Sequence, residues 1–160
     1  MNDTPPSAPT DTDAAPEPGE ARVSGHTLAH VPGRFLLSAR TNHLVTDSRF
    51  GPGESIQAGE LLLAALTSCA MANIQSNAAA EDLPLTDIDV RAEHRRGSTD
   101  VTRYDYTTVY VHLTGVDQPT AESLTTRFTE TCPIYNTVRR GSGIELVVTS
   151  EVMNSAQRTR

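Results

Sequence analysis

The stretch GELLLAALTSCAMANIQSNAAA, residues 59–80, decides the fold. Leucine, alanine, methionine and glutamine favour helix, and they continue here for about six turns, so the stretch predicts one long α-helix. The first half of this helix is apolar on almost every side. Because such a helix must be covered on more than one side, we expect either a sheet wrapped around it or a second subunit packed against it.

Strand-like segments lie on both sides of this helix. Pro-Gly and Asn turn residues separate the segments before it, which predicts a β-meander, and polar–apolar alternation in the first two segments after it predicts a hairpin. The chain therefore predicts an α+β fold. The expected strands are residues 23–31, 34–40, 43–47, 88–95, 104–116 and 144–152, and the further expected helices are residues 119–132 and 134–140.

The two ends of the chain differ in composition from its middle. Residues 1–20 hold five of the ten prolines and five acidic groups, without an arginine, which predicts a disordered, acidic, Pro-rich tail. We expect one domain over residues 21–153, long enough to bury a core of its own. Residues 154–160 are expected to form a short C-terminal tail.

Charge and residue usage exclude several classes of function. The net charge of −7 argues against nucleic acid and against anionic membrane surfaces as partners. No stretch approaches the roughly 18 consecutive apolar residues of a membrane span, and a signal peptide is not evident, so we expect a cytoplasmic protein. The two cysteines are too few for a cysteine zinc site, and the five histidines lack ligand spacing, so we expect neither a metal nor a cofactor.

The two cysteines are the candidate reactive groups, because cytoplasmic thiols stay reduced unless they react. Cys69 lies about three turns into the predicted helix, where the dipole field has faded and apolar neighbours raise a thiol pKa, so any activation must come from tertiary structure. The other interpretation of Cys69 is a small hydrophobic core residue. Pro133 suits the first position of a helix and places Cys132 at its N-cap, either as an activated thiol or merely as a cap. Together the pair suggests redox chemistry, since a second thiol can resolve a sulfenic acid.

Two segments carry a family resemblance. GELLLAALTSCAMA, residues 59–72, resembles the motif around the first cysteine of the OsmC/Ohr family, and CPIYNTVRRG, residues 132–141, resembles the second-cysteine motif of its smaller OsmC-like members. The order of elements is also similar, over about residues 22–152. The resemblance implies an OsmC-like fold, in which antiparallel sheets wrap around a long central helix and two chains form an intertwined homodimer.

The resemblance also implies a thiol peroxidase that reduces organic hydroperoxides. Cys69 would attack the peroxide and become a sulfenic acid, Cys132 would resolve it, and a dithiol, either lipoyl or a small molecule, would restore the enzyme. The family's thiolate-stabilising arginine corresponds to Arg34, with Arg40 as the second candidate, and the glutamate that orients it corresponds to Glu60. The best-studied peroxidase branch carries that glutamate one position earlier, where this chain has Gly59.

A second hypothesis keeps the fold without the chemistry. In it the chain is a non-catalytic dimeric OsmC-like protein that binds a small hydrophobic ligand in an apolar interface pocket, and both thiols are inert. A thioesterase is a third possibility, but no acyl-carrier or carboxylate motif supports it.

Overall fold

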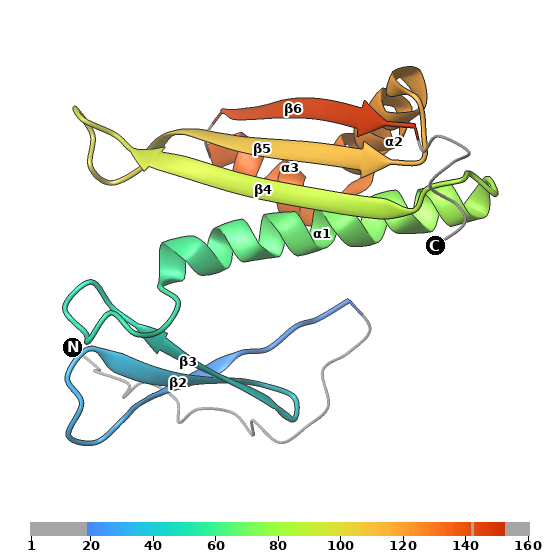
Figure 1. Ribbon diagram of the computed structural model, residues 1–160. Helices are drawn as coiled ribbons and strands as arrows, with labels where there is room; N and C mark the ends of the chain where they lie inside the picture. Colours follow the sequence, from blue (N-terminus) through green and yellow to red (C-terminus); the bar gives the residue numbers. More distant parts are fainter. Residues whose placement is uncertain (1–18, 142, 153–160) are drawn as a thin grey trace, which may run out of the picture. The chain divides into compact units, whose positions relative to one another are not determined.

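The computed structural model describes residues 19–141 and 143–152 (Figure 1). The chain divides into two compact units, Met1–Gln57 and Ala58–Arg160, which are described separately below. The predicted C-terminal tail and all but the last two residues of the predicted N-terminal tail lie outside the described residues. Within the described ranges, no helix is both long enough and apolar enough to cross a membrane.

The first unit contains a three-stranded antiparallel meander, which confirms the prediction for this part of the chain. A two-residue turn joins the second and third strands, and Arg40 adopts a left-handed φ of 57° in it. Arg40, the second candidate for the thiolate partner, is therefore an exposed turn residue. The strands are β1 (Ser24–Thr27), β2 (Arg34–Ala39) and β3 (Asn42–Asp47).

A buried carboxylate ties this meander to the glycine-rich loop that follows it, residues 48–57. Arg34 and Asp47 are cross-strand partners, and the guanidinium binds the carboxylate through two hydrogen bonds, Nε to Oδ1 at 2.8 Å and NH2 to Oδ2 at 3.0 Å. The backbone N–H groups of Glu54 and Ser55 donate to the same carboxylate at 2.8 and 3.0 Å. The Asp47 side chain is completely buried. The loop is thus held in place by Asp47.

The second unit begins with the long helix, and helix and hairpin both appear where they were predicted. The helix α1 is 23 residues long, and β4 and β5 form an antiparallel hairpin. The elements of this unit are α1 (Ala58–Ala80), β4 (Asp87–Arg96), β5 (Tyr104–Thr114), α2 (Gln118–Thr131), α3 (Pro133–Gly141) and β6 (Ile144–Glu151).

The expectation of purely antiparallel sheets is wrong for the last strand. β6 pairs with β5 in parallel, from Ile144 opposite Thr107 to Glu151 opposite Thr114. The reason is the connection, because α2 and α3 carry the chain back along the sheet before β6 begins, and such a crossover brings the next strand in parallel. The sheet order is β4-β5-β6, with β5 in the centre.

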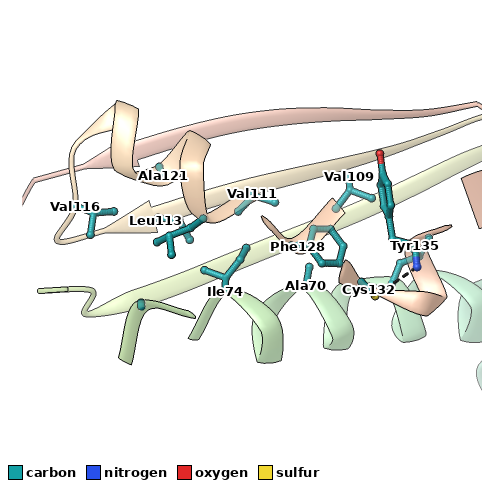
Figure 2. Close-up of a cluster of buried hydrophobic side chains, with 13 residues drawn as sticks. Ala70, Ile74, Val109, Val111, Leu113, Val116, Ala121, Phe128, Cys132 and Tyr135 are labelled. Carbon is teal, nitrogen blue, oxygen red and sulfur yellow. Dashed lines mark hydrogen bonds between the residues drawn. The ribbon is translucent and has the colours of Figure 1, made fainter. Parts of the chain in front are cut away.

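The hydrophobic core lies between this sheet and the three helices. α1 contributes one buried stripe with a spacing of four residues, which matches one face of a helix. Figure 2 shows how side chains of α1, β5, α2 and α3 meet in this core. Its buried members are Leu66, Ala70, Ile74, Ala78, Val109, Val111, Leu113, Val116, Ala121, Leu124, Phe128, Cys132 and Tyr135.

A first prediction concerns Phe128, which is fully buried and packs edge-to-face against Tyr135 with 5.3 Å between ring centroids. Phe128→Ala removes a large side chain from a closed core, so we expect the free energy of unfolding to fall by about 3–5 kcal/mol in chemical denaturation. The control is Val101→Ala, at a residue that is 64% exposed, with an expected change within about 0.5 kcal/mol. Equal losses in the two variants would contradict this description of the core.

A second prediction concerns Asp47. Hydrogen bonds from Arg34, supported by those from the backbone of the loop, hold the pKa of Asp47 well below its usual range. The ionised carboxylate therefore stabilises the first unit above about pH 4, and this contribution is lost as the pH falls through the lowered pKa. At pH 6 we expect β2 and β3 to be better protected from hydrogen exchange in the wild-type protein than in Asp47→Asn. This difference in protection should shrink towards pH 2. A difference that is constant with pH would show that the charge of Asp47 does not stabilise this unit.

Candidate functional site

The structure brings the two predicted cysteines together, although they are 63 positions apart in the sequence. Cys69 lies near the middle of α1, and Cys132 lies at the junction of α2 and α3, both of which pack against α1. Their Sγ atoms are 2.6 Å apart, and one thiol donates a hydrogen bond to the other. Both cysteines are free thiols. The arrangement is a reduced pair whose sulfurs are already in contact.

Cys132 is held by the first turn of α3. Pro133 is the first residue of that helix, as predicted, and the backbone N–H of Tyr135 donates to Cys132 Sγ at an N···S distance of 3.4 Å (Figure 2). The backbone N–H of Asn136 donates to the Cys132 carbonyl at 3.1 Å. Cys132 therefore caps α3 with both its carbonyl and its thiol. Its exposed fraction is 0%, so solvent does not reach it in this arrangement.

Cys69 is only partly buried, and its surroundings favour the protonated thiol. Burial raises the pKa of Cys69 to about 11, and the hydrogen bond and charge of the neighbouring Cys132 act in the same direction. The apolar packing of α1 therefore raises the pKa of the Cys69 thiol, as its apolar sequence neighbours predicted. A Cys69 thiolate at neutral pH requires a favourable charge or hydrogen bond beyond those of this arrangement.

Asparagine side chains hold the backbone around the pair, and the sequence interpretation missed them. The Asn136 amide donates to the carbonyls of Thr129 and Cys132 at 2.9 and 3.0 Å, which joins the end of α2 to the start of α3. On α1, the Asn73 amide donates to Thr131 Oγ1 at 3.3 Å. The available signal was the position of Asn73, an amide with low helix propensity one turn after Cys69 inside a long helix.

Arg34, the predicted thiolate partner, belongs to the first unit and has two carboxylate partners there. Besides its two bonds to Asp47, its NH2 group donates to Glu54 Oε2 at 2.9 Å. The two carboxylates differ in exposure, since the Asp47 side chain is 0% exposed and that of Glu54 is 73% exposed. Arg34 thus has one buried and one solvent-accessible partner, and its role towards Cys69 stays a prediction.

Glu60 lies in the first turn of α1, beside the position at which the best-studied peroxidase branch carries glutamate. At that position a Cβ on Gly59 would lie 2.8 Å from the Tyr104 hydroxyl and 3.1 Å from His94 Cε1. The Tyr104 and His94 rings are stacked, with 3.7 Å between centroids. Position 59 therefore cannot hold a side chain unless these rings shift. The pKa of His94 is lowered, mainly by burial, while the nearby negative charge of Glu60 acts in the opposite direction.

Metal-ligating side chains do not gather in the described part of the chain. Among residues 19–141 and 143–152, no group of three or more His, Cys, Asp or Glu side chains is arranged to hold a metal ion.

Comparison with solved structures gives the fold. An OsmC-like protein from Mycoplasma pneumoniae has 13% sequence identity and a TM-score of 0.73, and the match covers 84% of this chain and 98% of that one. An organic hydroperoxide resistance protein OsmC from Legionella pneumophila has 20% identity, a TM-score of 0.64 and coverage of 83% and 97%. The organic hydroperoxide resistance protein OhrB of Bacillus subtilis has 13% identity, a TM-score of 0.63 and coverage of 82% and 99%. At these identities the likeness shows a shared fold.

Sequence comparison gives the family. No sequence among the curated proteins matches the chain. The family described as OsmC-like protein matches residues 51–147, which is more than half of the 160 residues and includes both cysteines. The chain therefore belongs to the OsmC-like protein family, as the motifs around its two cysteines predicted.

Proposed function

We propose that this protein is a thiol peroxidase that reduces organic hydroperoxides. The observation that carries the proposal is the 2.6 Å contact between the Sγ atoms of Cys69 and Cys132. A thiol that is oxidised to sulfenic acid is protected from further oxidation when a second thiol reaches it and forms a disulfide. The names of the structural relatives from Legionella pneumophila and Bacillus subtilis support organic hydroperoxides as the substrate class.

The difference in burial supports distinct roles for the two thiols. Cys69 is partly accessible and Cys132 is fully buried, so Cys69 meets the peroxide. Its thiolate attacks one peroxide oxygen, the O–O bond breaks, and the alkoxide takes a proton and leaves as the alcohol. The Cys132 thiolate then attacks Sγ of the Cys69 sulfenic acid, and hydroxide leaves and is protonated to water. A dithiol, either lipoyl or a small molecule, reduces the resulting disulfide by two thiol–disulfide exchanges and returns both thiols.

The first step needs an ionised Cys69, and burial opposes this. A positive charge within about 4–6 Å lowers a thiol pKa by about 1–3. We propose Arg34 as that charge and Glu60 as the carboxylate that orients it. The exposed Glu54 is the partner that Arg34 exchanges most easily for a thiolate, whereas buried Asp47 retains the guanidinium by two hydrogen bonds.

We propose that the protein acts as a homodimer. The face of α1 opposite its buried stripe is exposed and consists mainly of small side chains, which allow a second helix to approach closely. A second copy packed on this face covers the side of α1 that the β4-β5-β6 sheet of the same chain leaves exposed. The exposed small residues include Ala64, Ala65, Ser68 and Ala72, with the exposed Met71 beside them. We place this dimer in the cytoplasm, where reductants keep such thiols available.

Two observations favour the second candidate function, a non-catalytic dimer that binds a small hydrophobic ligand. The pKa of Cys69, about 11, is that of an unreactive thiol, and Arg34 has two carboxylate partners of its own. In this alternative the contact between the sulfurs is only core packing. Turnover of a hydroperoxide separates the two functions.

A third prediction concerns turnover of cumene hydroperoxide with dihydrolipoamide as reductant. Cys69→Ser should abolish turnover, because the remaining thiol, Cys132, is fully buried and does not meet the peroxide. Cys132→Ser should consume about one equivalent of peroxide per chain and then stop, because the sulfenic acid has no resolving thiol. Phe50→Ala, at an exposed residue of the loop, is the control and should retain turnover.

Equal activity in the two cysteine variants would contradict the assigned roles. A wild-type protein that consumes no hydroperoxide under these conditions would contradict the peroxidase and leave the ligand-binding alternative.

A fourth prediction concerns the dimer. Ala65→Arg places a long charged side chain on the exposed face of α1, where close packing of a second helix excludes it. We expect the sedimenting mass to fall from that of two chains to that of one, while far-UV circular dichroism stays unchanged. Asp89→Arg, on the exposed side of β4, is the matched control and should leave two chains. A wild-type protein that sediments as one chain would contradict the proposal.

A further inference from the structure

We infer that Asn73 is a positioning residue for disulfide formation, acting through Thr131 on the cysteine that follows it. The inference rests on the proposed function, because it concerns the step in which Cys132 resolves Cys69. It assigns a task to two polar side chains next to the thiol pair.

Asn73 and Thr131 form a second link between the two segments that carry the cysteines. Asn73 lies one turn after Cys69 on α1, and residues four apart in a helix lie on the same face. Thr131 is the last residue of α2 and directly precedes Cys132. The Asn73 Nδ2 group donates to Thr131 Oγ1 at 3.3 Å, next to the 2.6 Å contact of the sulfurs. We call this pair of residues, Asn73 and Thr131, the amide brace.

The surrounding hydrogen bonds orient the amide brace. Asn77 Nδ2 donates to Asn73 Oδ1 at 2.9 Å, so the oxygen of the Asn73 amide is engaged along α1 and its nitrogen points to Thr131. The Thr131 hydroxyl donates to the Arg127 carbonyl at 2.7 Å, which leaves its oxygen as the acceptor for Asn73. The direction of each bond in this chain is therefore consistent with that of the next.

The segment that follows the amide brace is also held by hydrogen bonds, so a displacement of the brace is transmitted to Cys132. The Asn136 amide holds the Cys132 carbonyl and that of Thr129, and the Tyr135 N–H holds Cys132 Sγ. The cysteine thus lies between the brace on one side and the first turn of α3 on the other. A displacement of Thr131 away from α1 moves Cys132 away from Cys69.

The brace matters because disulfide formation within one chain depends on how well the two sulfurs are held together. Two sulfurs that are already held in a reactive geometry react faster than two that must first come together, because the conformational entropy has been lost before the reaction. The coupling is reciprocal, so if the brace favours the disulfide, the disulfide also favours the brace. Loss of the brace should both slow closure and make the disulfide easier to reduce.

The experiment measures the dithiol–disulfide equilibrium of the full chain in buffers of oxidised and reduced dithiothreitol, with acid quench, alkylation and mass spectrometry. Asn73→Ala removes the donor, and Thr131→Val removes the acceptor at nearly constant shape. A net hydrogen bond is worth about 0.5–1.5 kcal/mol, or roughly twofold to tenfold, and it shifts the equilibrium only by the part that is stronger in the disulfide than in the dithiol. The equilibrium constant for the disulfide should therefore fall in each variant, by at most about tenfold. Thr131→Ser retains the hydroxyl and should restore the wild-type value within about twofold.

The matched control is Thr129→Val, the same chemical change two residues earlier, which keeps the backbone carbonyl that Asn136 binds. The Thr129 hydroxyl donates to the Thr126 carbonyl within α2, so its loss affects the helix without affecting the link to α1. We expect wild-type equilibrium in this control. Stopped-flow mixing with cumene hydroperoxide then gives the rate of closure, which should fall in Asn73→Ala and Thr131→Val and remain unchanged in Thr129→Val.

Each outcome bears on a different claim. Unchanged equilibrium and closure in Asn73→Ala and Thr131→Val would overturn the inference, as would an equal fall in Thr129→Val. A fall in the dithiothreitol equilibrium in a protein that does not react with hydroperoxide would support the brace and contradict the peroxidase. Normal peroxide reduction with equal closure in all variants would support the peroxidase and contradict the brace.

Discussion

The contact between the sulfurs of Cys69 and Cys132 depends on how three helices share one face of a sheet. α1 supplies one cysteine, and the α2–α3 junction supplies the other, which lies entirely within the core. The parallel return of β6 is part of the same constraint, because the crossover between β5 and β6 carries α2 and α3 over the face on which α1 packs. The packing that buries Cys132 therefore also places its sulfur in contact with that of Cys69.

The same packing opposes ionisation of the Cys69 thiol. Apolar surroundings keep Cys69 protonated, and a peroxidase must overcome that burial with positive charge. Arg34 is built into a cluster with one buried and one exposed carboxylate, Asp47 and Glu54. A guanidinium that exchanges the exposed partner for a thiolate remains held by the buried one. The proposed peroxidase requires this exchange if Arg34 is to stabilise the Cys69 thiolate.

The sequence predicted the elements well and their three-dimensional relations less well. Periodicity and turn residues located α1, the meander and the hairpin, because these are local properties of the chain. The parallel pairing of β6 was missed, since strand order depends on the path of a crossover rather than on the strand itself. Both cysteines were identified from their local contexts, and Pro133 correctly placed Cys132 at a helix start. The Asp47 cluster and the amide brace join residues far apart in sequence, through polar groups that have no periodicity.

The measurement that tests this account most directly is peptide mapping of the reduced protein after one equivalent of an organic hydroperoxide, with free thiols alkylated at the time of quenching. The account predicts that Cys69 and Cys132 of the same chain are recovered as one disulfide-linked pair, with one equivalent of alcohol formed. Recovery of both cysteines as alkylated thiols, or of Cys69 in a stable sulfinic acid with Cys132 free, would contradict it.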